Sequence, residues 1–502
     1  MVDVAILGGG LAGLTLALQL KRRRAAIDVV VVDPHQRPAP ERTSTVGEAL
    51  AEVSAHYLRE VLDLADHLDA DQLPKFGLRF FVGDRWDLAE RFEIGPLHPS
   101  ICEFEHGRFV GLPLRTHQVD RGRLENELAI RCESAGVRLR LGCRAVAVRP
   151  DDSGHRVSVA GDEGGSVRAR WVVVASGGQR AGLPVEVRPL NHRVHAAWAR
   201  VNGDLDVGQW SADPRFVERT LPGLRRYSTN HLMGRGYWAW VIPLPTGVTS
   251  VGVVADPAVV GSLPQDYEAL LRWLRPRDPR LAEALAGTTP VAGDFHAADL
   301  AAFRATRCFR GGRVAVVGGA AAAVDVLYSP GADLIAVGNS MLTDIVDRDL
   351  GGERIAAHCA VADRIFAGFA EGLADIYRGQ YRHFGSPAFV ATKVTWDSAL
   401  YFGFHTLLFR HGVFGDPGVL ASAGAELTAV ERLQARVQGR LRDGNFVPLV
   451  DVSSGFVEWG SIKWLMAAYF GARAQPDESA LMAELRRTLS TLEGLARRLG
   501  EG

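Results

Sequence analysis

Three glycines near the amino terminus have the spacing of a nucleotide-binding turn. Gly8, Gly10 and Gly13 form a GxGxxG pattern between an apolar, strand-like segment and a segment with helical spacing. In such a turn the first glycine allows the tight bend, the second lets the backbone approach a pyrophosphate, and the third lets helix and strand pack closely. Asp33 ends the next apolar run, where a carboxylate can accept hydrogen bonds from ribose hydroxyls. Segment 2–33 therefore predicts a dinucleotide site, with Leu11 and Ala12 in its turn.

Several later segments end in small-residue turns that can return to the same nucleotide. Segments 171–178 and 312–320 each read as an apolar strand that runs into a glycine-rich turn. A GxGxxG turn alone fits FAD and NAD equally, but several returns to one site indicate a large, continuously held cofactor and favour FAD. The residues that we assign to this cofactor besides the first turn are Val46, Gly47, Glu48, Gln118, Gly318 and Gly331.

Trp238 and Trp240 stand one residue apart in the strand-like segment GYWAWVIPL, 236–244. In a strand, both rings point to the same face. The rings then either fill the core of a sheet or line a binding site, and the spacing alone leaves both interpretations open.

Composition limits the classes of function. The 502 residues carry 57 Lys and Arg against 58 Asp and Glu, a formal net charge of -1, so nothing draws the whole chain toward nucleic acid or an acidic membrane. The five cysteines show no CxxC pair and no metal-ligand spacing, and no apolar run approaches the roughly 20 residues that cross a bilayer. We expect a cytoplasmic protein without a metal site. The cysteines are Cys102, Cys132, Cys143, Cys308 and Cys359.

Taken together, these segments resemble the FAD-dependent halogenases, which belong to the p-hydroxybenzoate-hydroxylase-like flavoprotein superfamily. The resemblance extends over about residues 1–345. It implies that Trp238, Trp240, Ile242 and Pro243 line a wall between the flavin and the substrate chamber. The motifs that carry it are GGGLAG at 8–13, VGEA at 46–49, PKFGLRF at 74–80, WxWxIP at 238–243 and YSPG at 328–331.

The resemblance also implies a reaction. FAD, reduced by a separate flavin reductase, would react with O2 to a hydroperoxide, and chloride or bromide would convert this to hypohalous acid. The acid would reach Lys75, which acts either as an ammonium that hydrogen-bonds the oxidant or as a neutral amine that forms a haloamine; burial would lower the lysine pKa and help the second route. Tyr328 and Ser329 would complete the catalytic set.

The expected product is a halogenated, electron-rich aromatic secondary metabolite, such as a phenol or a pyrrole, either free or tethered to a carrier protein. Four positions depart from the family pattern. Tyr328 replaces the glutamate of tryptophan-acting members, Pro330 has no amide proton for a halide, Gly319 replaces an aspartate, and Val326 replaces the proline of an Asp-Pro pair. Two alternatives therefore stay open: a halogenase-like flavin monooxygenase or oxidase that uses no halogen, and a flavin-binding scaffold protein.

We expect an α/β fold, in which a Rossmann-type FAD-binding domain is interleaved with a mixed-sheet substrate domain over residues 1–340. Residues 341–502 would form a helical region that closes the substrate pocket. The strand-like segments 137–148, 156–159 and 193–201 are expected in the sheet above the substrate cavity. His56, His231 and His405 are interpreted as structural or exposed rather than as catalytic bases.

Overall fold

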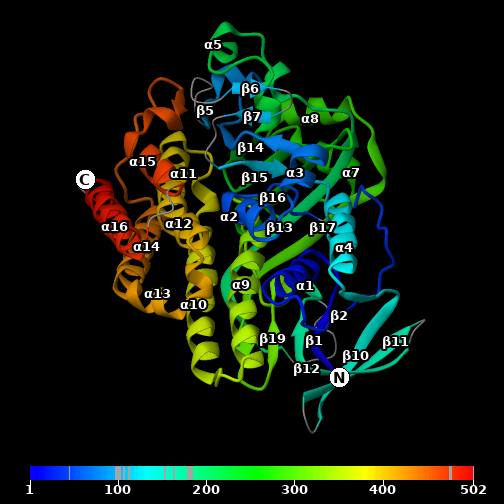
Figure 1. Ribbon diagram of the computed structural model, residues 1–502. Helices are drawn as coiled ribbons and strands as arrows, with labels where there is room; N and C mark the ends of the chain where they lie inside the picture. The colour runs from blue at the N-terminus through cyan, green and yellow to red at the C-terminus, as the bar shows by residue number, and fades with distance from the viewer. Residues whose placement is uncertain are drawn as a thin grey trace.

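The computed structural model describes residues 1–43, 46–96, 103–105, 108–110, 114–151, 154–161, 164–177, 185–473 and 477–500. Across these ranges an eight-stranded and a nine-stranded sheet lie beside a group of carboxyl-terminal helices (Figure 1). The expected fold class, an interleaved α/β unit with a helical carboxyl-terminal region, is confirmed. Cys102 and Gly178, the end of the predicted turn at 171–178, lie outside the described residues.

The first sheet is built around β1 (Val2–Leu7), which pairs in parallel with β2 (Val29–Val32) on one side and β12 (Gly165–Val174) on the other. β9 (Arg138–Arg140) and β19 (Val314–Val316) extend this parallel core. β1 and β2 are almost continuously apolar and buried because parallel strands are covered on both faces. α1 (Leu11–Arg23) packs against α4 (Arg121–Ser134) and α9 (Pro330–Leu350).

Two segments that we expected above the substrate cavity belong to this first sheet instead. β10 (Cys143–Asp151) and β11 (Gly154–Gly161) form a hairpin whose second strand pairs with the first half of β12, and β9 lies beside β2. The expectation for 137–148 and 156–159 was therefore wrong, because residue alternation predicts a strand but does not say which sheet it joins. Segment 193–201 does lie in the second sheet, in β13 (Val187–Asn202).

The second sheet contains the tryptophan pair in β15 (Tyr237–Pro243), between β14 (Thr229–Gly234) and β16 (Val248–Ala255). Trp240 stands opposite Gly252, and a side chain at Gly252 would overlap the Trp240 ring. The glycine therefore makes room for the indole. The remaining strands, in sheet order, are β20 (Ala322–Ala323), β17 (Pro290–Ala305) and β13 before β16, and β4 (Leu78–Val82), β5 (Phe92–Gly95) and β21 (Phe456–Glu458) after β14.

The carboxyl-terminal helices pack beside both sheets. α9 runs without a break through position 340, so the predicted division at 340/341, which stays a prediction, lies in the middle of one helix. α11 (Pro387–Leu400) continues through a π-helical turn at Tyr401–Thr406 into α12 (Leu407–Arg410). The other long helices are α10 (Ala356–Asp375), α14 (Gly424–Asp443), α15 (Lys463–Gly471) and α16 (Glu478–Gly500).

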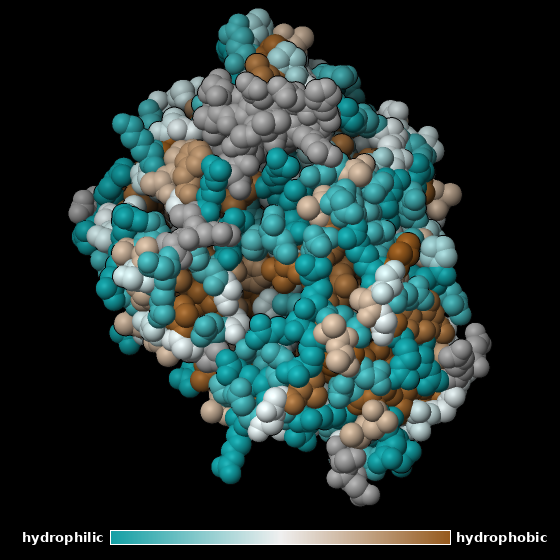
Figure 2. Space-filling view, in the orientation of Figure 1, coloured by the Kyte–Doolittle hydropathy of each residue, from teal (hydrophilic) through white to brown (hydrophobic). Residues whose placement is uncertain are grey.

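The face in Figure 2 is mainly hydrophilic, with apolar residues in small groups between polar ones. Among the described helices, none combines the length and the apolar character that crossing a bilayer requires. Cys132, Cys143, Cys308 and Cys359 are buried free thiols.

Candidate functional site

A cavity of about 1660 Å³ opens where the parallel strands of the first sheet end. Residues at the carboxyl ends of β1, β2 and β12 line it, which is where open α/β sheets bind their ligands. Its volume exceeds the roughly 300–1,000 Å³ of pockets for drug-sized molecules, so it suits a ligand as large as a dinucleotide. The predicted cofactor residues in its lining are Gly8, Gly10, Leu11, Ala12, Asp33, Val46, Gly47, Glu48 and Gly331.

The three glycines of the first turn have different surroundings. Gly8 has a φ of +118°, and a Cβ there would lie 2.6 Å from the Ala175 carbonyl oxygen. A Cβ on Gly13 would collide with the Gly8 carbonyl oxygen, so this glycine serves helix packing and does not line the cavity. A Cβ on Gly10 would meet no atom within 4 Å. Gly10 therefore borders open space at the amino end of α1, where helices bind phosphate groups.

Polar groups in the cavity also fit a nucleotide. The Gly9 amide donates to Asp33 Oδ2 at 2.5 Å and the His35 amide donates to Oδ1 at 2.8 Å, which fixes the carboxylate. Among the described residues, three buried hydroxyls of the lining have no hydrogen-bond partner. Such groups call for a polar ligand, because an unpaired buried hydroxyl is costly. They belong to Thr43, Ser176 and Thr229.

The loop 46–48 is held from two sides. Arg121 donates to the Val46 carbonyl oxygen at 2.9 Å, and Arg200 donates to Glu48 Oε1 at 2.7 Å. Burial raises the pKa of Glu48 even though Arg200 opposes the shift.

Besides Gly13, two more of the predicted cofactor residues, Gln118 and Gly318, lie outside this lining. The Gln118 side chain donates to the Tyr227 carbonyl oxygen at 3.2 Å. Gly318 lies against Ala12, where a Cβ would be 2.6 Å from the Ala12 side chain, and its neighbour Gly319 lines the cavity instead.

Trp238, Trp240 and Ile242 form part of the cavity wall, while Pro243 does not. The two indole rings lie 5.7 Å apart. The Trp238 N–H donates to the Tyr381 hydroxyl at 2.8 Å, and this hydroxyl donates to Asp325 Oδ2 at 2.5 Å. The wall is therefore tied to the helical region, through a tyrosine that lies more than 140 residues away in sequence.

The loop 328–331 divides its residues between two environments. Ser329, with a φ of +58°, Pro330 and Gly331 line the cavity at the start of α9. The Tyr328 side chain instead donates to Asp397 at 3.2 Å. Asp397 also accepts bonds from Lys393 and Gln438, each at 2.8 Å, so Tyr328 belongs to a buried polar network in the helical region.

Lys75 is buried, with 3% of its surface exposed, at the end of β3 (Leu73–Lys75). Its ammonium donates to the Leu50 carbonyl oxygen at 2.7 Å. Burial lowers the lysine pKa to about 8, and the charges of Glu52 and Asp333 oppose this shift. Lys75 does not line the large cavity, but its charge acts on His231, which does. The pKa of His231 falls to about 4, chiefly through burial, so this ring is neutral near pH 7.

Asp333 and Glu52 form a carboxyl pair near Lys75 that sequence reasoning missed. Asp333 accepts hydrogen bonds from the Ser54 amide at 2.9 Å and from the Tyr401 hydroxyl at 2.8 Å. Burial raises the pKa of Asp333 to about 6 and that of Glu52 to about 7. In sequence, both look like ordinary acidic residues in the first turn of a helix, so no local signal marks them.

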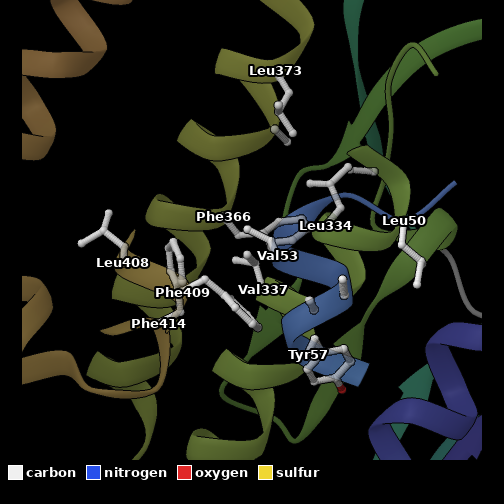
Figure 3. Close-up of a cluster of buried hydrophobic side chains, with 14 of the residues drawn as sticks. Leu50, Val53, Tyr57, Leu334, Val337, Phe366, Leu373, Leu408, Phe409 and Phe414 are labelled. Carbon is white, nitrogen blue, oxygen red and sulfur yellow. The ribbon is translucent and has the colours of Figure 1, made fainter. Parts of the chain in front are cut away.

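Apolar packing fixes α2 (Glu52–His56), which carries Glu52, against α9, which carries Asp333. Figure 3 shows Val53 and Tyr57 beside Leu334 and Val337 of α9, with Phe366 of α10 nearby. The burial of these side chains supplies the hydrophobic free energy that holds two acidic groups close together.

Comparison with known proteins shows the family of the chain. The family described as FAD dependent oxidoreductase matches residues 3–300, more than half of the chain. The chain therefore belongs to the FAD-dependent oxidoreductases, and it is an enzyme that uses FAD. The resemblance to the FAD-dependent halogenases is confirmed by relatives and by solved structures.

Among its relatives, the flavin-dependent halogenase chlA of Dictyostelium discoideum is 24% identical over 445 residues, which are 80% of this chain and 69% of chlA. A menaquinone reductase of Mycobacterium tuberculosis is 29% identical over 264 residues, 50% of this chain and 55% of that protein. The crystal structure of the halogenase PltM in complex with phloroglucinol and FAD shares the fold with a TM-score of 0.65 at 16% identity, over 98% of this chain and 96% of PltM.

Proposed function

We propose that this protein is a halogenase-type oxidoreductase that uses reduced FAD, supplied by a separate flavin reductase, and O2 to install chloride or bromide on an electron-rich aromatic compound. The observation that carries the proposal is the position of Lys75. Its ammonium is buried, and among the described residues its one hydrogen bond goes to Leu50 O. An ammonium has three donors, so two remain to hold a small oxidant.

In this proposal the residues of the cavity hold the cofactor and keep the substrate away from it. The turn 8–13 and Asp33 bind the dinucleotide, which supplies the oxygen-activating chemistry when bound. Trp238 and Trp240 exclude the organic substrate from the cavity. Lys75 holds the hypohalous acid by hydrogen bonds and orients it toward the ring to be halogenated.

A halide would have to bind differently here from the family pattern. Ser329 precedes α9 and Pro330 begins it, and proline offers no N–H, so the Gly331 amide is the first backbone donor of this helix, at a residue that lines the cavity.

A second candidate is a related flavoenzyme that oxidises or hydroxylates its substrate without halogen. Pro330 favours it, and so does the menaquinone reductase relative, whose name describes a reaction without halide.

The deciding experiment is mass spectrometry of a reaction that contains the protein, FAD, a flavin reductase with NADH, O2, bromide and a panel of phenols and pyrroles. We expect a bromine isotope doublet that is lost in Lys75→Ala and kept in Lys463→Ala, a matched change at an exposed lysine. Oxygenated or dehydrogenated product without bromine would reject the halogenase proposal in favour of the second candidate.

A further inference from the structure

A pocket of about 190 Å³ is separate from the large cavity, and Lys75 is in the lining of neither. Its lining includes Glu52, whose charge acts on Lys75, while His231, on which the charge of Lys75 acts, lines the large cavity. Lys75 therefore interacts electrostatically with one lining residue of each cavity: Glu52 in the small pocket and His231 in the large cavity. The lining of the small pocket is completed by His56, Arg59, Glu60, Leu114, Arg115 and Arg410.

The cations of this pocket are incompletely neutralised. Arg59 is paired with Asp69 at 2.6 Å, and Arg115 lies 3.6 Å from the same carboxylate. Arg410 instead contacts His56 Nδ1 at 3.0 Å, and its buried Nε has no hydrogen-bond partner among the described residues.

The pKa values indicate which groups of the lining are charged near pH 7. Burial and the charge of Arg410 lower the pKa of His56 to about 4, so His56 adds no charge near pH 7 and can accept the Arg410 bond. Two carboxyl groups, Glu52 and Glu60, face the cations. Burial raises the pKa of Glu52 to about 7, which leaves part of this group neutral at physiological pH.

The pocket is smaller than sites for drug-sized ligands, which span roughly 300–1,000 Å³, so it suits a single aromatic ring. The His56 ring meets the Phe409 ring edge-on at 6.1 Å, and Phe409 also contacts Tyr57 at 6.1 Å. These contacts keep the wall that carries His56 and Arg410 in place.

We propose that this pocket is the substrate site of the proposed reaction, and that the substrate is a small aromatic compound with an anionic group, such as a hydroxybenzoate. Arg410 binds the anion, and the ring lies toward Glu52 and Lys75. This inference rests on the proposed function for the oxidant, hypohalous acid.

The chemistry balances with the groups present. The ring carbon forms a bond to the halogen while the oxygen–halogen bond breaks, and the oxygen leaves as water after taking a proton from the Lys75 ammonium. The ring proton passes to the Glu52 carboxylate, which returns a proton to Lys75. Glu52 therefore acts as the base that restores aromaticity, a role for which a pKa near the working pH is well suited.

Binding is the first test, and calorimetry on the FAD-loaded full chain measures it without turnover. The probes are 4-hydroxybenzoate and its neutral analogue 4-hydroxybenzamide. We expect the acid to bind at least about tenfold more tightly, and Arg410→Gln to remove this preference while leaving the amide unaffected, because hydrogen bonds to charged groups contribute the difference. Arg410→Lys keeps the charge and should keep the preference. Arg486→Gln, at an exposed arginine, is the control.

Equal binding of acid and amide, no binding of either probe, or an unchanged preference in Arg410→Gln would each overturn the substrate class. A parallel bromination assay separates the two proposals. Failure of binding with bromination retained rejects only the pocket, whereas binding of 4-hydroxybenzoate without brominated product rejects only the halogenase function.

The role of Glu52 has its own readout. We expect Glu52→Gln to retain 4-hydroxybenzoate binding and O2 consumption but to lose most brominated product per O2 consumed, with released hypobromous acid detected by a chemical trap. Glu52→Asp should restore part of the product. An unchanged ratio of brominated product to O2 consumed in Glu52→Gln would show that Glu52 is not the base of the reaction.

Discussion

The indole N–H of Trp238 and the hydroxyl of Tyr381 form a 2.8 Å hydrogen bond that joins the cavity wall to the helical region. Asp325 accepts a hydrogen bond from the Tyr381 hydroxyl at 2.5 Å and also contacts His192 at 2.7 Å, so four side chains share one buried network.

Tyr381→Phe would remove two hydrogen bonds: the one that the Trp238 N–H donates to the tyrosine hydroxyl, and the one that this hydroxyl donates to Asp325. Because buried unsatisfied groups cost about 1–3 kcal/mol each, we expect a clear loss of stability in urea denaturation and slower, weaker quenching of flavin fluorescence on FAD binding. Trp238→Phe removes only the indole bond and should cost less. Equal stability of Tyr381→Phe and the wild type would show that the network does not support the wall.

The three glycines of the first turn should respond differently to alanine. Gly10→Ala meets no atom within 4 Å, so we expect a folded protein whose FAD affinity falls at least about tenfold, because the methyl group occupies the space where a phosphate would approach. Gly13→Ala should unfold readily, since its Cβ collides with the Gly8 carbonyl oxygen. Gly439→Ala, in open space on α14, is the control. An FAD affinity of Gly10→Ala equal to that of the wild type would mean that the phosphates of FAD do not bind at this turn.

Stability should fall as pH rises through neutrality because of Glu52. Its pKa is about 7 in the folded protein and 4.5 ordinarily, so the folded state binds the proton more tightly. The resulting stabilisation is fully present below pH 4.5 and is lost as the pH rises through 7. Asp333, with a pKa raised to about 6, acts in the same direction. Lys75 has the opposite pH dependence because its pKa is lowered in the folded protein. Its contribution to stability is present above pH 10.5 and is lost as the pH falls through 8.

Glu52→Gln cannot ionise, so we expect its free energy of unfolding to match that of the wild type near pH 4.5 and to exceed it at pH 8 by about 3 kcal/mol, at about 1.4 kcal/mol per pKa unit. Urea midpoints at the two pH values measure this, with Glu493→Gln at an exposed helical position as the control. A variant that is less stable than the wild type at pH 8 would mean that Glu52 is ionised and paired.

Tyr328 should matter for stability and not for turnover. Tyr328→Phe removes one of three hydrogen bonds to Asp397, and we expect a loss of about 1–2 kcal/mol with product formation retained. Tyr328→Glu would bring a second carboxylate beside Asp397 and should destabilise the protein further. Loss of product formation in a Tyr328→Phe variant that is folded and binds FAD would show that Tyr328 takes part in catalysis.

Local patterns predicted the parts of the fold that local sequence controls. The GxGxxG turn, Asp33 and the tryptophan strand could be read from spacing because backbone geometry at these positions requires particular residues. The assignment of 137–148 and 156–159 to a sheet failed because strand pairing joins distant segments. The surroundings of Lys75 could not be predicted for the same reason: Leu50 with Glu52, Asp333, and Tyr401 come from three separate stretches and meet only in the folded chain.

Helix α9 has 21 residues and so is about 30 Å long. Its first turn lines the large cavity and also carries Asp333, and the Asn339 side chain donates to the carbonyl oxygen of Ala12 in the glycine turn at 3.1 Å. A continuous helix moves as a rod, so a displacement at its first turn carries Asp333 with it. We therefore expect a ligand that displaces this turn to displace Asp333 relative to Lys75 as well, so that occupation of the cavity changes the charge around the lysine.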